Sequence, residues 1–223
     1  IAVAVLVAFI ILLPFSRDIF TLVSEPLREV LPGNAMIATA VASPLLTPFK
    51  LTFFAALFLV MPVVLFQVWN FIAPGLYKNE KRFAIPLLAT SIVLFYLGIA
   101  FAYFVVFPLI FGFFTSIAPE GVEVQTDITQ FLDFITTIVF AFGIAFEVPV
   151  ATVLIVWAGL TNIEKLAKAR PYVFLMAFIA GMFLTPPDVI SQSLLAVPVY
   201  LLYELGIIMS KVFVSKKSES DSS

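Results

Sequence analysis

The 223-residue sequence contains neither cysteine nor histidine, and only 12% of its residues are charged. The absence of both residue types excludes disulfide bonds, thiolate or imidazole metal ligands, histidine-ligated haem and histidine-based catalysis. Hydrophobic residues make up 62% of the sequence, and the mean hydropathy is +1.15. A chain with so little polar surface cannot cover a core in water. The composition therefore indicates an integral membrane protein.

Sequence motifs of several enzyme classes are also missing. An HExxH zinc site is impossible without histidine, no Gly-x-Ser triplet offers a serine nucleophile, and no GxxxxGK[ST] loop is present to bind phosphate. Asp133 and Asp188 do not stand in the helix-centre contexts of a paired-carboxylate protease. No ladder of Lys or Arg within an apolar segment suggests a voltage sensor. We therefore expect that the protein is not an enzyme and holds no metal or cofactor. Any work it does should draw its energy from a membrane gradient or from partner proteins.

Six apolar segments predict transmembrane helices, because a helix satisfies its own backbone hydrogen bonds in lipid. They cover residues 1–15, 45–71, 83–114, 134–159, 172–184 and 189–210. The first segment has few residues for a span and the sequence does not begin with methionine, so we expect further residues upstream. The fifth lies between Pro171 and the pair Pro186-Pro187, and it is short for a bilayer crossing.

Four of the six segments contain an internal proline, at residues 62, 108, 149 and 198. Because proline removes a helical hydrogen bond and bends a helix, the sequence predicts an all-α, kinked and concave bundle. We expect a single six-helix membrane domain over residues 1–214. Its external loop, residues 16–44, should contain a short amphipathic helix interrupted by Pro26. The charged, serine-rich tail at 215–223 is expected to be disordered in the cytoplasm.

Lysine and arginine are distributed unevenly between the two sides of these segments. Nine of the twelve lie within residues 78–82, 165–170 and 211–217, whereas the loops on the other side hold Arg17 and Arg28, with Lys50 near a helix start. The positive-inside rule places the nine in the cytoplasm. With six spans, both termini are then cytoplasmic.

Glu147 is the only charged residue of the fourth apolar segment and lies near its middle. A charge at a helix centre costs roughly 2.5–3.5 kcal/mol, so such a residue is a functional candidate. Gly143 and Ala151 should share nearly the same helical face and keep it thin, while Pro149 removes the amide that would bond the carbonyl of Ala145. The alternative is a protonated acid that bonds a neighbouring helix for packing alone.

Two other polar groups are candidates for binding. Asp188, Ser191 and Gln192 follow the double proline at the start of the last segment, although Asp188 could simply cap that helix. The loop FIAPGLYKNEKR at residues 71–82 joins two apolar segments and could equally be an ordinary charged turn.

The order of these motifs resembles the TatC family, the multispanning receptor of the twin-arginine protein translocase. The resemblance rests on FQVW at 66–69, FIAPGLY at 71–77, EKR at 80–82, FAYFVVFP at 101–108, AFGIAFEVP at 141–149 and LTPPD at 184–188. It implies six transmembrane helices in a kinked, cupped bundle with short fifth and sixth spans. In this family a cytoplasmic segment before the first helix carries a glutamate that helps to bind the signal peptide, and this sequence begins after that point.

The resemblance implies a function in protein export. The receptor recognises signal peptides with two adjacent arginines and exports folded proteins with the single-span proteins TatA and TatB, driven by the proton-motive force. It works as an oligomeric complex in the bacterial cytoplasmic (inner) membrane, in contact with lipid and not with nucleic acid. The alternative function is a proton-coupled secondary transporter of a small solute, which would use Glu147 and would predict inverted repeats and a narrow midplane pocket.

The resemblance and the residue chemistry together suggest two sets of site residues. A carboxylate can accept the planar guanidinium of arginine through two hydrogen bonds, which the point charge of lysine cannot match. The expected signal-peptide site therefore centres on Glu80, with Phe71, Lys78 and Arg82. The residues expected to serve partner docking or the transport step are Glu147, Asp188, Gln192 and Pro26.

Overall fold

The described part of the chain is almost entirely helical. The computed structural model describes residues 1–30, 37–39, 41–72, 81–116, 127–185 and 188–220, and it gives the backbone alone for 26–30, 71–72, 81–84, 115 and 213–220. Within these ranges no strand occurs, and the β-type pairing is limited to an isolated bridge between Ile37 and Asp127. The all-α prediction is confirmed.

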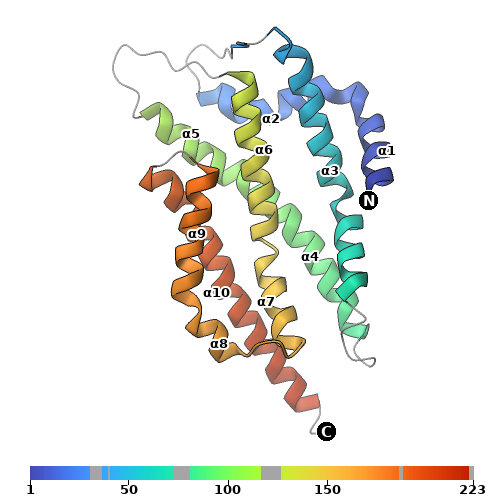
Figure 1. The fold of residues 1–223 in the computed structure, drawn as a ribbon, viewed down its shortest axis with the longest axis vertical. Coiled ribbons are helices and arrows are strands. Elements are labelled where there is room, and N and C mark those ends of the chain that lie inside the picture. Colours follow the sequence, from blue (N-terminus) through green and yellow to red (C-terminus); the bar gives the residue numbers. More distant parts are fainter. Residues whose placement is uncertain (31–36, 40, 73–80, 117–126, 186–187, 221–223) are drawn as a thin grey trace. The chain divides into compact units, whose positions relative to one another are not determined.

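The helices follow one another along the chain as Figure 1 shows. In order they are α1 (Ala2–Leu12), the 3-10 turn η1 (Leu13–Phe15), α2 (Ser16–Val30), α3 (Ser43–Ile72), α4 (Lys81–Phe101), the π-helical segment η3 (Ala102–Val106), α5 (Phe107–Ser116), α6 (Ile128–Ala145), α7 (Val148–Trp157), α8 (Ile163–Lys168), α9 (Arg170–Leu184) and α10 (Val189–Ser220). The helix expected in the loop at 16–44 is α2. The interruption predicted at Pro26 is wrong, because α2 continues through this residue.

Among the described residues, five helical stretches are long and apolar enough to cross a membrane. They are Ala2–Glu25, Ser43–Asn70, Ile85–Phe114, Ile128–Trp157 and Val189–Val212. The shorter α9, with 15 residues, is a sixth apolar helix. These six stretches overlap the six predicted segments, so the chain is a multi-pass membrane protein.

The fifth apolar helix is short, as predicted, but the sixth is not. At roughly 1.5 Å per residue α9 is about 22 Å long, against about 30 Å of hydrocarbon in a typical bilayer. The last span, Val189–Val212, has 24 residues, because α10 continues through Pro198 without a break. α10 runs on as far as Ser220, while the single domain at 1–214 and the disorder of the tail at 215–223 stay predictions.

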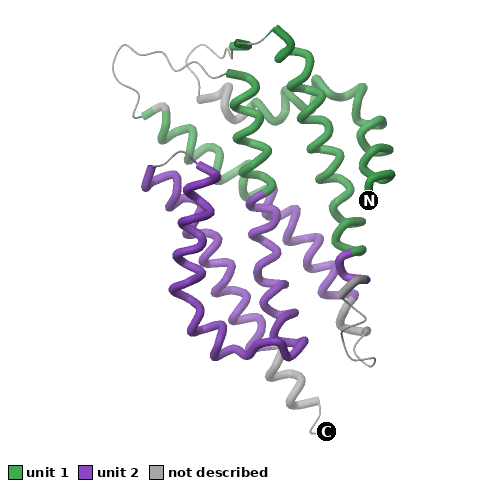
Figure 2. Tube along the Cα trace, in the orientation of Figure 1, with its two compact units in different colours: residues 1–67, 100–140 green, residues 68–99, 141–223 purple. Residues whose placement is uncertain are grey.

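The chain forms two compact units (Figure 2). Unit 1 comprises residues 1–67 and 100–140, and unit 2 comprises residues 68–99 and 141–223. Three helices, α3, α4 and α6, contribute residues to both units.

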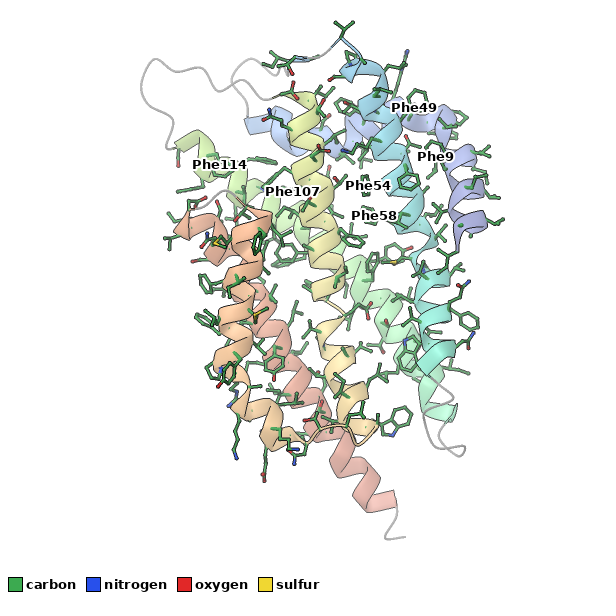
Figure 3. The ribbon with its side chains drawn as sticks, in the orientation of Figure 1. Phe9, Phe49, Phe54, Phe58, Phe107 and Phe114 are labelled. Atoms are coloured by element: carbon green, nitrogen blue, oxygen red, sulfur yellow. The ribbon has the colours of Figure 1, made fainter. Side chains whose placement is uncertain are left out.

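Aromatic and small apolar side chains fill the core of unit 1. Val5 of α1 belongs to a buried cluster with Ala56 of α3. Farther along, the ring of Phe58 in α3 stacks on that of Phe140 in α6, with centroids 6.5 Å apart. Phe107 at the start of α5 is completely buried (Figure 3). The first two contacts join α1 to α3 and α3 to α6 through side chains that carry no polar group.

Asp127 fixes the start of α6 in unit 1. Its Oδ1 accepts hydrogen bonds from the amides of Thr129 and Gln130, at 2.8 and 3.1 Å. Its Oδ2 accepts bonds from the hydroxyl and the amide of Thr39, at 2.7 and 3.0 Å. The bond from the Thr39 hydroxyl is the largest of the causes that lower the pKa of Asp127 to about 2. The ionised carboxylate therefore ties residues 37–39 to the beginning of this helix.

The four prolines for which bending was predicted affect the backbone differently. α3 and α10 continue as helices through Pro62 and Pro198. The helix is interrupted next to Pro149, between α6 and α7, and it changes to the π register just before Pro108. A local irregularity therefore accompanies two of the four prolines.

Candidate functional site around Glu147

Glu147 lies where the fourth apolar helix is interrupted, between α6 and α7. Its amide donates to the carbonyl of Ile144 at 3.0 Å, a bond that reaches three residues back and not four. Pro149 has no amide hydrogen to offer the carbonyl of Ala145. The interruption that Pro149 predicts is thus present, and it lies at Glu147 itself.

One hydroxyl holds the carboxyl group of Glu147. The Oγ of Ser91, in α4, donates to Oε2 of Glu147 at 2.5 Å, and Ser91 is only 1% exposed. The other carboxyl oxygen, Oε1, is buried and has no hydrogen-bond partner among the described residues. The ion pairs in the described part of the chain are Lys50–Asp133 and Arg170–Glu204, so none of them involves Glu147.

A close approach of two helices brings Ser91 within reach of Glu147. A Cβ added to Gly98 of α4 would lie 2.5 Å from the carbonyl oxygen of Phe142 in α6, and one added to Gly143 would lie 2.6 Å from the ring of Phe95. Neither position can accept a larger residue unless its neighbour moves. The thin face predicted at Gly143 is therefore confirmed, with α4 as the neighbouring helix.

Ala151 does not share this close contact, although the sequence pattern grouped it with Gly143. It is exposed. The tightened turn at Glu147 changes the helical register, so positions on either side of it no longer follow one continuous face. The predicted small-residue face is thus limited to its α6 part.

Apolar side chains pack against one side of the helix that follows Glu147. Val150 and Val153 of α7 form a buried cluster with Trp69 of α3 and Leu87 of α4. The carboxyl group of Glu147 and its hydroxyl donor, Ser91, therefore lie about one helical turn from a buried apolar cluster of unit 2, where a hydrogen bond is stronger than in water. A polar group that reached Oε1 would find an acceptor, or a donor if the acid is protonated, with no competing partner among the described residues.

At roughly 1.5 Å per residue, Glu147 lies about 15 Å along the helix from Trp157, the end of its span. That distance is about half of the roughly 30 Å hydrocarbon thickness. The chain therefore places a carboxyl group at membrane depth, next to a helix interruption and held by a single side-chain donor.

Asp188 caps the last helix. Its Oδ1 accepts a hydrogen bond from the amide of Ser191 at 2.7 Å, as expected of a capping residue. Its Oδ2 and the Oγ of Ser191 are buried and have no hydrogen-bond partner among the described side chains. Gln192 lies against α9, since a Cβ added to Gly181 would be 3.4 Å from the carbonyl oxygen of Gln192. No hydrogen bond in the described residues links this group to Glu147.

The residues predicted to bind a signal peptide lie at the edge of the described structure. Phe71 is in the last turn of α3 and Arg82 in the first turn of α4, where the backbone alone is described. Lys78 and Glu80 lie outside the described residues. Pro26, predicted to serve docking or transport, is within the part of α2 for which the backbone alone is described.

Sequence reasoning missed Ser91 and a second intramembrane carboxylate, Glu204 of α10. The Oε2 of Glu204 accepts a hydrogen bond from Nη2 of Arg170 at 2.8 Å, and its Oε1 accepts one from the hydroxyl of Tyr200 at 2.9 Å. Glu204 is the only charged residue within residues 189–210. The argument that singled out Glu147 would therefore have found it.

The family model for the Sec-independent protein translocase protein (TatC) matches residues 1–198. The chain belongs to the TatC family. It is 62% identical over 205 residues to the TatC protein of Azotobacter chroococcum mcd 1, a match that covers 92% of this chain and 80% of that relative. Its identity to the TatC protein of Escherichia coli (strain K12) is 57% over 215 residues, covering 96% and 83%.

Solved structures agree with this assignment. The fold is similar to a crystal structure of the twin arginine translocase receptor TatC, with a TM-score of 0.84 and 35% identity, covering 95% of this chain and 93% of that one. This TatC protein is thus a component of a Sec-independent protein translocase, a transport protein. The alternative of a small-solute transporter is not supported.

Proposed function

We propose that this TatC protein is the receptor subunit that binds twin-arginine signal peptides and exports folded precursor proteins together with TatA and TatB. The observation that supports the proposal is the similarity, over 95% of the chain, to a solved twin arginine translocase receptor. Export would take place in an oligomeric complex of the bacterial inner membrane and would draw on the proton-motive force. Both termini would lie in the cytoplasm, on the side of the nine clustered lysines and arginines.

The signal peptide would bind at the connection between α3 and α4. Glu80 directly precedes the first residue of α4, a position where the helix dipole favours a negative charge. Its carboxylate can accept two parallel hydrogen bonds from one guanidinium group, a geometry that an ammonium group cannot offer. Phe71 would add apolar contact, and Lys78 would lie in the same site. Lys81 and Arg82, next to Glu80 in the sequence, would compete with the peptide for its carboxylate.

A crosslinking experiment tests the peptide site. A photoreactive residue at position 79 should crosslink to a twin-arginine signal peptide and much less to its twin-lysine version. Glu80→Gln keeps the size but removes the charge, and a hydrogen bond to a charged group is worth about 1.5–3 kcal/mol, so affinity should fall roughly ten- to a hundredfold. Glu123→Gln, in another loop, is the matched control. Equal crosslinking of both peptides, or unchanged affinity of Glu80→Gln, would remove Glu80 from the site.

Glu147 would serve the docking of a partner helix or the transport step, and not the first recognition of the signal peptide. The support for this role is its depth in the span and the buried Oε1, for which the described residues supply no partner. A polar side chain on a TatA or TatB helix could form that missing hydrogen bond. Asp188, Gln192 and Pro26 would contribute to docking elsewhere on the chain.

A further inference from the structure

The amphipathic helix α2 continues through Pro26, although proline has no amide hydrogen. In an α-helix the amide of residue 26 would donate to the carbonyl of Leu22, four residues earlier. That carbonyl therefore lacks its helical donor. Backbone carbonyls are nearly always paired, so a donor from elsewhere is expected.

The hydroxyl group of Tyr103 is that donor. It forms a hydrogen bond of 2.8 Å to the carbonyl oxygen of Leu22, from a position 81 residues away in the sequence. Tyr103 belongs to η3, which leads directly into α5, and α2 packs against α5 within unit 1. The bond thus links two helices at the point where one of them is missing a bond of its own.

The π register of η3 accompanies a second proline. Pro108 offers no amide to the carbonyl of Phe104, and just before it the amide of Phe107 donates five residues back, to the carbonyl of Ala102. One residue inserted in this way turns the side chains on its two sides by about 100° relative to each other. Tyr103 lies inside this insertion, and its ring packs edge-on against Phe104 and Phe107 with centroids 4.9 and 6.4 Å apart. These contacts fix the direction of its hydroxyl group.

We propose that Tyr103 is a positioning residue for α2: its hydroxyl replaces the amide that Pro26 lacks and so fixes α2 against α5. A proline at position 26 leaves the carbonyl of Leu22 available, and a tyrosine in the π segment occupies it. The two prolines act together, because Pro26 leaves the carbonyl of Leu22 as an acceptor and Pro108 accompanies the π register that directs the hydroxyl of Tyr103 toward it.

Hydrogen exchange followed by mass spectrometry tests this link in the full chain in lipid nanodiscs. Tyr103→Phe should speed exchange of the α2 peptide 16–25 by roughly two- to tenfold, the factor that corresponds to one neutral hydrogen bond. In a Pro26→Ala background the amide of residue 26 can bond the carbonyl of Leu22, so Tyr103→Phe should leave the exchange rate unchanged. Tyr172→Phe, at an exposed tyrosine of α9, is the matched control.

The comparison of the two backgrounds decides the outcome. Equal acceleration in both would mean that Tyr103 acts through ring packing alone, and no acceleration in the parent would mean that the bond does not hold α2; either result overturns the proposal. If Tyr103→Phe fails to fold, recovery of folding in the Pro26→Ala, Tyr103→Phe double variant supports it and failure of both overturns it. The measurement needs no signal peptide, so it stands apart from the proposed receptor function.

Discussion

Removing the hydroxyl of Ser91 should show whether the carboxyl group of Glu147 has to be held in one position for export. Ser91→Ala removes the single side-chain donor to a buried carboxyl oxygen. A buried polar group that loses its partner costs about 1–3 kcal/mol, which corresponds to roughly a 5–150-fold shift in the population of the held arrangement. We expect Ser91→Ala to slow the export of a folded reporter with a twin-arginine signal by a factor within that range.

The variants of Glu147 set the scale for this effect. Glu147→Gln keeps an oxygen that can accept the Ser91 bond and an amide that can donate to a partner, so it should retain much of the export activity. Glu147→Ala loses both and should be the most impaired. Signal-peptide binding should stay close to that of the parent in all three variants, because Glu147 lies about half a bilayer away from the loop that carries Glu80.

A serine on another helix supplies the control. Ser193→Ala, in α10, removes a hydroxyl whose hydrogen bond in the described part of the chain is to the carbonyl of Val189 in its own helix, and it should export like the parent. Normal export by both Glu147 variants would support a packing role alone. Loss of peptide binding in a correctly inserted Glu147→Ala protein would instead place this residue in the receptor site. Normal export by Ser91→Ala beside an impaired Glu147→Ala would show that the carboxyl acts without its hydroxyl donor.

Three further predictions concern stability and topology. Gly206→Ala should destabilise the protein by about 1–3 kcal/mol, because the new Cβ would lie 2.1 Å from Oγ1 of Thr152, whereas Gly112→Ala, with no atom within 4 Å, should be nearly neutral in thermal unfolding. The stability that Asp127 contributes should be complete above about pH 4 and lost as the pH falls through about 2, since its pKa is lowered in the folded state; a parent and an Asp127→Asn variant with the same pH profile would contradict this. Reporter fusions at residues 79, 162 and 218 should be cytoplasmic and those at 34 and 121 external, and a single exchanged pair would contradict the six-span orientation.

The sequence predicts the spans well because long apolar runs are a strong signal that depends on no tertiary contact. It also predicts Glu147 as an isolated charge and the interruption at Pro149, since both follow from the chemistry of one segment. Ser91 could not be paired with Glu147 in advance, because they are 56 residues apart and meet only where Gly98 and Gly143 let two helices approach.

Two predictions about helix ends and breaks were wrong because the effect of a proline depends on its surroundings. The last helix was expected to be short, but α10 extends well beyond the bilayer thickness because Pro198 does not end it. A proline removes one hydrogen bond, and whether the helix then breaks, changes register or simply continues depends on the helices packed around it. Pro26 illustrates the last case, since the hydroxyl of Tyr103 takes over the carbonyl that the proline leaves without a donor.

The short helix α9 has a consequence for the lipid around it. When the other end of α9 lies at one face of a hydrocarbon layer of about 30 Å, Arg170, its first residue, is about 22 Å along the helix and so some 8 Å inside that layer. Glu204 lies about 22 Å along α10 from Val189 at roughly 1.5 Å per residue, at a matching depth, and the two side chains form an ion pair. Arg170 can remain at this depth because Glu204 of the adjacent helix α10 pairs with it. We therefore expect headgroups and water to dip toward α9, so that the bilayer is locally thinner beside this helix.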